Sequence, residues 1–87
     1  MNNIRDFFSA AEKGNANAQK DLAAMLASGS LGQVDNESAA YWYSKAAEQG
    51  LVDAKWNLGL MYVNGEGVEK SERFGLELIE KSATEGS

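Results

Sequence analysis

Apolar residues recur along this chain with the spacing of α-helices. Near the N-terminus, Ile4, Phe7, Phe8 and Ala11 follow an i, i+3, i+4, i+7 pattern, which places them on one face of a helix. The same spacing recurs further along the chain, and no run of alternating β-branched residues indicates a strand. The pattern therefore predicts an all-α protein. Its five predicted helices cover about residues 3–13, 16–28, 36–49, 52–64 and 71–85.

Individual residues are predicted to begin or end these helices. Gly14, Gly50 and Gly86 each follow an alanine-containing segment, so we expect them to adopt the positive φ that a residue just beyond a helix end often needs. Asn36 is predicted to cap the start of one helix and Ser71 the start of another, because their side chains can accept a hydrogen bond from a free backbone amide.

The pattern repeats after 36 residues without a gap. The segment Ala10–Gly14 returns as Ala46–Gly50 and, in altered form, as Ser82–Gly86. A fixed period of roughly 20–50 residues is typical of stacked supersecondary units, and short linkers make neighbouring helices antiparallel. We therefore expect an α/α superhelix, or solenoid, in one domain. Its predicted parts are an N-terminal helix at 1–14, a first helical-hairpin repeat at 15–50 and a second at 51–87.

Composition narrows the classes of function. The formal net charge is −5, which repels nucleic acid and attracts a basic protein surface. No apolar run approaches the roughly 20 residues that a membrane span requires, and the N-terminus lacks the pattern of a secretory signal. The chain has no cysteine, so it tolerates a reducing compartment, and we expect a cytoplasmic location.

Catalytic chemistry finds little support in the residues. There is no histidine, which removes the usual acid/base near neutral pH and the usual partner of a nucleophile. Gly65-Glu66-Gly67 lacks the lysine and hydroxyl of a phosphate-binding loop, and the acidic residues lack the spacing of a calcium loop. We therefore predict no catalytic, cofactor or metal site, and a protein that is not an enzyme.

Two segments resemble a known family. Residues 54–68 read AKWNLGLMYVNGEGV and residues 39–50 read AAYWYSKAAEQG, which is similar to the two halves of a Sel-one-like repeat (SLR). The first repeat departs from the family pattern, with Ala23 where the family prefers glycine and Leu26 where it prefers tyrosine. The resemblance implies a right-handed superhelix of helical hairpins, related to tetratricopeptide repeats, that serves as a scaffold for protein–protein contacts.

Trp56 is predicted to lie outside the apolar stripe of its helix. It lies about 200° around the helix from Leu58, counted at about 100° per residue, whereas Trp42 and Tyr43 occupy packing positions of the family. The resemblance places Trp56 on the face that tetratricopeptide-type proteins use as a concave groove. An exposed tryptophan is a common interface anchor; partial burial against a neighbouring helix is the alternative. The predicted partner-binding groove consists of Asn17, Lys20, Ala24, Asp53, Trp56, Leu60 and Asn64.

A second contact surface is predicted on the last helix. Leu76, Ile79 and Ala83 follow an i, i+3, i+7 pattern, so we expect them to face the preceding hairpin. Phe74 and Leu78 lie on a neighbouring stripe, where a longer solenoid would place its next repeat. We therefore predict a homodimer or partner contact through Phe74 and Leu78, with folding back over the preceding helix as the alternative.

The sequence thus favours a non-enzymatic protein–protein interaction module. Small size and acidity suggest a bacterial inhibitor or immunity protein that binds a basic protein partner. The alternative is a homo-oligomeric assembly or adaptor scaffold. The two hypotheses differ in an observable property, because the inhibitor is expected to be monomeric or weakly dimeric alone, whereas the assembly protein is expected to form a stable homo-oligomer.

Overall fold

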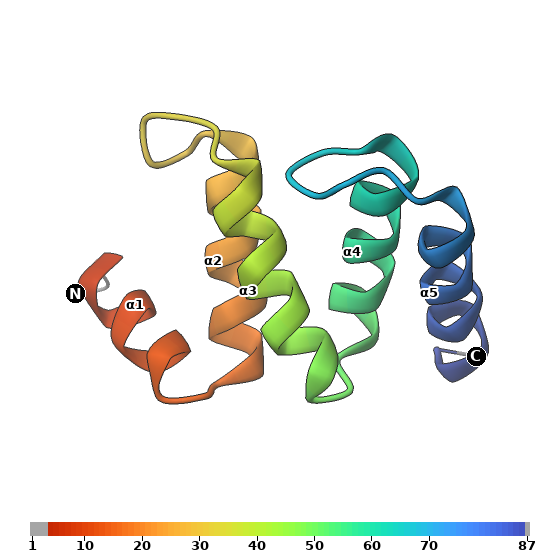
Figure 1. Cartoon of the computed structure of the whole chain (residues 1–87). Coiled ribbons are helices and arrows are strands. Elements are labelled where there is room, and N and C mark those ends of the chain that lie inside the picture. The colour runs from red at the N-terminus through yellow and green to blue at the C-terminus, as the bar shows by residue number, and fades with distance from the viewer. Residues whose placement is uncertain (1–3, 87) are drawn as a thin grey trace.

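A row of five helices makes up the computed structural model, which describes residues 4–86 (Figure 1). Consecutive helices pack against each other, so that a single helix is followed by two hairpins, α2–α3 and α4–α5. No strand occurs within the described residues. The helices are α1 (Ile4–Glu12), α2 (Ala16–Ser28), α3 (Asn36–Glu48), α4 (Val52–Asn64) and α5 (Glu72–Glu85).

The predicted all-α solenoid is confirmed. Every predicted helix is present, and its ends fall within about one residue of the predicted ones. The predicted start at residue 3 lies outside the described residues. The alanine-rich sequence explains the compact hairpins, since small side chains let helix backbones approach each other closely while keeping high helix propensity.

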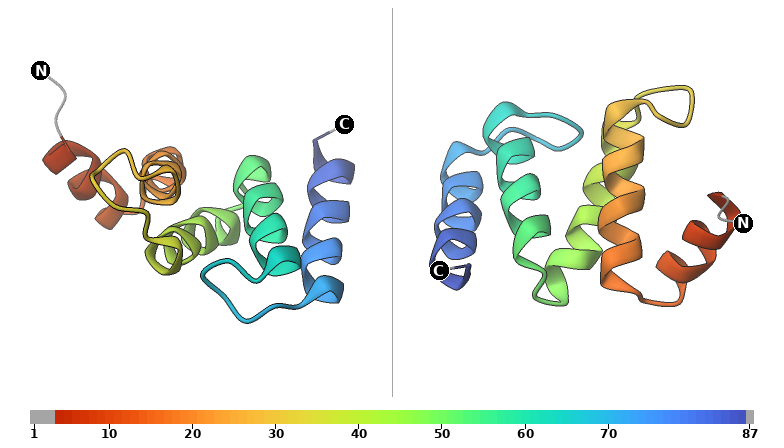
Figure 2. Two further views of the ribbon diagram at one scale, coloured as in Figure 1. Left: turned by 90° about the horizontal axis from the view of Figure 1, so that it is seen from above. Right: turned by 180° about the vertical axis from the view of Figure 1, so that it is seen from behind.

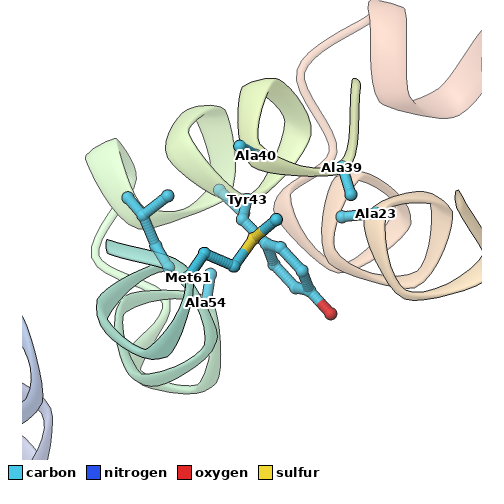
Figure 3. Packing of buried hydrophobic residues seen from close by; sticks show 8 residues of the cluster. Ala23, Ala39, Ala40, Tyr43, Ala54 and Met61 are labelled. Carbon is cyan, nitrogen blue, oxygen red and sulfur yellow. The ribbon is translucent and has the colours of Figure 1, made fainter. Parts of the chain in front are cut away.

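Two clusters of buried side chains hold the row together. The smaller one lies between α1 and α2 and contains Ala11, Ala18 and Leu22. Tyr43 is 6% exposed, which confirms its predicted role in the core. Trp42 packs against both clusters but is only half-buried. The larger cluster, drawn in Figure 3, consists of Ala23, Ala39, Ala40, Tyr43, Ala46, Ala54, Leu58 and Met61.

The predicted helix ends are correct at two glycines and wrong at the third. Gly14 and Gly50 have φ values of 101° and 93°, in the left-handed region that glycine adopts without steric cost. Gly86 instead has φ −86°. Its amide donates a hydrogen bond of 2.9 Å to the Ser82 carbonyl, so the backbone still follows the helical turn there and needs no positive φ.

The predicted caps are correct for α5 and displaced by one residue for α3. Ser71 Oγ accepts a hydrogen bond from the Phe74 amide at 3.2 Å, as expected of an N-cap. At α3 the cap is Asp35, not Asn36. The Asp35 carboxylate accepts from the Ser38 amide at 3.0 Å and from the Ser38 hydroxyl at 2.8 Å, and these bonds lower the pKa of Asp35 below its usual range.

The prediction for the packed side of α5 was wrong for Leu76 and Ala83 and correct for Ile79. Leu76 is 52% exposed and Ala83 is also exposed, so neither faces the preceding hairpin. The side that packs on α4 contains Gly75 and Ser82, which are buried, together with the half-buried Leu78 and Ile79. A pattern of apolar residues misses this side, because a glycine occupies the position where the two backbones come close and a serine occupies the other buried position.

Candidate functional site

An open groove lies between α2 and α4, and α3 forms its floor. Along the row, α3 lies between α2 and α4 (Figure 2). The groove has a volume of about 370 Å³. It is lined by Lys20, Asp21 and Ala24 from α2, Tyr43 from α3, and Asp53, Trp56 and Asn57 from α4.

Trp56 provides the largest apolar surface in this groove. Its side of α4 is opposite to the buried stripe of Ala54, Leu58 and Met61, and 45% of the residue is exposed. The predicted exposure of Trp56 is therefore confirmed. A tryptophan in this position offers a large flat surface at a low cost in conformational entropy when it is covered by a partner.

Two carboxylates and one ammonium group set the charge of the groove. Lys20 Nζ lies 3.8 Å from Asp21 Oδ1 and 4.0 Å from Asp53 Oδ2. Both aspartates are well exposed, and an exposed ion pair of this length contributes at most about 1 kcal/mol. The arrangement leaves one net negative charge, and Lys20 can move away from the aspartates at little cost.

Tyr43 contributes its hydroxyl group to the groove from α3. Its ring packs among the residues of the larger cluster, and its hydroxyl points outward from that cluster (Figure 3). Burial raises the pKa of the Tyr43 phenol above its usual range, and the negative charge of Asp21 raises that pKa further. The hydroxyl therefore stays protonated at neutral pH and can donate a hydrogen bond to a group bound in the groove.

The structure brings together four of the seven residues predicted for the groove, namely Lys20, Ala24, Asp53 and Trp56. Asn17 instead lines a neighbouring hollow between α1 and α2, with a volume of about 290 Å³. Leu60 and Asn64 are exposed and lie further along α4, outside the residues that line the groove.

Three groove residues were missed in the sequence. Asn57 lies four residues after Asp53, and Asp21 lies three residues before Ala24, so extending the predicted stripes by helical spacing finds both. Tyr43 was identified only as a core residue. Nothing in its spacing indicates that the hydroxyl end of a buried ring reaches the surface between two other helices.

The predicted surface on the C-terminal helix is less open than expected. Phe74 is 44% exposed, but its ring makes an edge-to-face contact with Tyr62 at a centroid distance of 4.7 Å. Leu78 is half-buried and packs against the larger cluster. Both residues line a hollow between α3 and α5, so they partly fold back, in the way given as the alternative.

Two further properties concern metal binding and membrane spans. Within residues 4–86, no group of three or more histidine, cysteine, aspartate or glutamate side chains is arranged to hold a metal ion. None of the helices in that part of the chain combines the length and apolar character needed to cross a membrane.

Comparison with known proteins identifies the repeat. The Sel1 repeat model matches residues 16–51 and 52–87. A Sel1 repeat protein from Oxalobacter formigenes is 37% identical, with a TM-score of 0.91 and a match that covers 97% of this chain and 63% of that one. A second similar structure is that of c5321, a protective antigen present in uropathogenic Escherichia coli strains that displays an SLR fold. It is 33% identical to this chain, with a TM-score of 0.91. The match covers 97% of this chain and 18% of that one.

A third solved structure extends the likeness. Helicobacter pylori cysteine rich protein B is 28% identical, with a TM-score of 0.87 and coverage of 99% of this chain and 68% of that one. Sel1 repeat proteins are generally protein–protein interaction modules built on a non-catalytic repeat scaffold. Since the two matched segments together cover well over half of the chain, this chain belongs to the Sel1 repeat family.

Proposed function

We propose that this chain is a non-enzymatic protein-binding module whose groove between α2 and α4 receives a basic segment of a protein partner. The observation that carries the proposal is Trp56, exposed at 45% beside the carboxylates of Asp21 and Asp53. The face of an indole ring attracts a lysine or arginine side chain, and the two carboxylates offer hydrogen-bond acceptors to the same cation.

The overall charge supports the same class of partner. The net charge of −5 accelerates encounter with a basic surface and disfavours a nucleic acid. A small inhibitor or immunity protein, acting in the cytoplasm on a basic protein, is the form of this function that size and acidity favour. Lys20 acts as an internal counter-ion that the partner's cation displaces.

The test compares two exposed aromatic residues. The chain serves as bait for partner capture, and binding of the captured partner is then measured by calorimetry. Trp56→Ala is expected to weaken binding by about 2 kcal/mol or more without changing the melting temperature. Tyr41, which is 55% exposed on α3 outside the groove, supplies the matched control Tyr41→Ala. Equal affinity for the wild type and Trp56→Ala would refute the groove, and an unfolded Trp56→Ala would show that Trp56 is a core residue.

A homo-oligomeric assembly or adaptor scaffold is the second candidate. It is favoured by Phe74, which remains 44% exposed at the end of the row. Sedimentation of the chain alone at micromolar concentration separates the two functions. A binding module is monomeric or weakly dimeric, whereas an assembly protein forms a stable homo-oligomer that Phe74→Glu and Leu78→Glu dissociate. Because Leu78 is half-buried, Phe74→Glu alone is the cleaner variant.

A further inference from the structure

Asn64 is followed by Gly65 at the end of α4, and no other asparagine of the sequence precedes a glycine. The amide of an asparagine side chain can be attacked by the backbone nitrogen of the next residue, which closes a five-membered ring. A glycine at the next position hinders this attack least, because it has no Cβ atom. The Asn64 side chain is exposed and makes no hydrogen bond with another residue in 4–86. This pair is therefore the most reactive asparagine site of the chain.

The reaction needs water as its only co-reactant. The Gly65 nitrogen forms a bond to Asn64 Cγ, and the bond between Cγ and Nδ2 breaks. The proton of the Gly65 amide leaves with Nδ2 as ammonia, and a succinimide ring remains. Water then opens the ring at either of its two carbonyl carbons, which gives aspartate or isoaspartate. Both products carry a new negative charge, and isoaspartate also adds one CH2 group to the backbone.

The folded chain keeps the attacking nitrogen occupied. Gly65 has φ 71°, and its N–H donates a hydrogen bond to the Met61 carbonyl. The same carbonyl accepts from the Glu66 amide at 2.9 Å. Asn64 has the helical backbone of α4, whereas ring closure requires its carbonyl group to rotate out of the helical position. The attack therefore requires the end of α4 to open first.

The loop that follows α4 holds this end in place. It extends from Gly65 towards the start of α3 (Figure 1), where a Cβ on Gly67 would collide with the Asn36 carbonyl. Where the loop ends, the Ser71 amide donates to the Tyr62 carbonyl at 2.9 Å. Since Gly65 is the first residue of this loop, its release from α4 disturbs these contacts. The packing of the loop thus controls how often the attacking nitrogen becomes free.

The first hairpin has the same helix end without the reactive group. Gly29 has φ 82°, and its N–H donates to the Met25 carbonyl. The 36-residue period places Ser28 at the position of Asn64. A serine cannot form the ring, because its side chain has no carbonyl carbon. The helix end therefore does not require an asparagine, and serine is a matched replacement taken from the chain itself.

We propose that Asn64 is a deamidation site that works as a one-way switch of the α4–α5 hairpin. The closed loop suppresses the reaction, and each opening of the loop permits it. The product places a negative charge at the C-terminus of α4, beside Glu66, where the helix dipole disfavours it. The extra CH2 group of isoaspartate also displaces Gly65 from its hydrogen bond. The loop then closes less well, and this holds whatever the groove between α2 and α4 binds.

Peptide mapping by mass spectrometry follows every asparagine while the whole chain is incubated at mildly alkaline pH. In concentrated urea, Asn64 is expected to convert faster than Asn36 and Asn57, which precede larger residues. In the native chain, conversion of Asn64 is expected to be at least about tenfold slower than in urea, because the end of α4 must open first.

The effect of the modification on the fold is measured separately. The modified chain is separated from the unmodified chain by its extra negative charge, and it is expected to melt at a lower temperature. The variant Asn64→Ser, incubated in the same way, is expected to keep its melting temperature. It retains the helix end of the first hairpin and lacks the reactive amide.

Two glycine variants distinguish opening of this loop from a general loss of stability. Gly67→Ala, which disturbs the contact with α3, is expected to accelerate conversion of Asn64 in the native chain by about tenfold. Gly32→Ala, in the loop of the first hairpin, is expected to leave that rate unchanged.

Each of four results would overturn the proposal. In urea, an Asn64 that converts no faster than Asn36 and Asn57 would leave no preferred site. Equal rates in urea and in the native chain would show that the fold does not protect the site. Equal acceleration by Gly67→Ala and Gly32→Ala would show that the loop after α4 does not control the reaction. An unchanged melting temperature of the modified chain would exclude a switch.

Discussion

The hairpins α2–α3 and α4–α5 occupy equivalent places in the repeat, but their helices meet in different ways. In α2–α3 the contact is made by the side chains of Ala23 and Ala39, both fully buried. In α4–α5 the equivalent residues are Gly59 and Gly75. A Cβ atom on Gly75 would lie 2.6 Å from the Gly59 carbonyl oxygen, and one on Gly59 would lie 2.8 Å from the Gly75 carbonyl oxygen. In α2–α3, methyl groups thus lie between the two helices, whereas in α4–α5 the two backbones are in direct contact, although the fold is the same.

A polar contact also differs between the hairpins. Gln19, 4% exposed, donates to the Ala11 carbonyl at 3.0 Å and accepts from Gln49 Nε2 at 2.9 Å. Their counterparts 36 residues later are Lys55 and Glu85, whose charged groups lie 2.6 Å apart. Neutral amides suit the buried position in the middle of the row, because burying an ion pair carries a large desolvation cost. The ion pair lies at the end of the row, where the Glu85 side chain is 44% exposed.

The two hairpin loops are a third difference. The loop between α4 and α5 lies against the start of α3, where a Cβ on Gly67 would collide with the Asn36 carbonyl, and Val68 packs against the larger cluster. The equivalent loop between α2 and α3 projects above α1 in Figure 1 and exposes Leu31 and Val34. The loop of the second hairpin is therefore packed on the preceding repeat, whereas the loop of the first hairpin exposes its apolar residues.

The largest expected effect comes from filling the backbone contact of the second hairpin. A methyl group in Gly75→Ala would lie 2.6 Å from the Gly59 carbonyl and 2.7 Å from Val63 Cγ2, so α4 and α5 must separate. We expect a loss of about 2–3 kcal/mol in unfolding free energy, despite a gain in helix propensity of up to about 1 kcal/mol. Urea denaturation measures it. The control Ala39→Gly opens no clash, but it loses helix propensity and a buried methyl group, so it is expected to cost about 1–2 kcal/mol. A Gly75→Ala chain more stable than the wild type would contradict the close contact.

The second largest effect is a difference in stability loss between substitutions in the two hairpin loops. Gly67 has φ 73° and no room for a side chain, whereas Gly32 has φ 114° and open space around it. Gly67→Ala is expected to cost about 2 kcal/mol, from backbone strain and collision together, and Gly32→Ala about 1 kcal/mol, from strain alone. Thermal unfolding of both variants measures the two losses of stability. Equal losses would mean that the loop of the second hairpin does not depend on α3.

A smaller effect concerns the ion pair of the second hairpin. Replacing both partners, as Lys55→Gln with Glu85→Gln, reproduces the amide pair of the first hairpin. We expect a change of no more than about 1 kcal/mol, because the pair is partly exposed and screened by solvent. The stability of the wild type is expected to fall slightly with added salt, while the double variant is insensitive to it. A salt dependence that persists in the double variant would exclude Lys55 and Glu85 as its source.

The smallest effect is a pH dependence that arises from Tyr43 of the first hairpin. Burial raises the pKa of Tyr43, so folding favours the protonated phenol, and this stabilisation is fully present below the ordinary tyrosine pKa of about 10. It is lost as the pH rises through the raised pKa. The equivalent residue of the second hairpin is Ile79, which does not titrate. Tyr43→Phe is therefore expected to reduce the loss of stability in alkaline denaturation; an unchanged alkaline profile would mean that Tyr43 titrates as it does in the unfolded chain.

The sequence determined those features of this protein that depend on local rules. Helical spacing and glycines set the five helices, and the 36-residue period set their order in a row. The angle between Trp56 and the apolar stripe of its own helix also predicted that Trp56 is exposed. These properties follow from the geometry of one helix, or of one repeat compared with the next, and need no knowledge of how two helices pack.

Which side of α5 is packed, and which residues complete the groove, depend on how the helices pack together. Gly75 faces α4 because the two backbones come too close there for a larger residue, and this leaves Leu76 outside despite its apolar side chain. Tyr43 reaches the groove because α2 and α4 leave a gap above α3. The physical reason is the same in both cases: burial depends on the distance and angle between helices, and side chains from several helices fix these together.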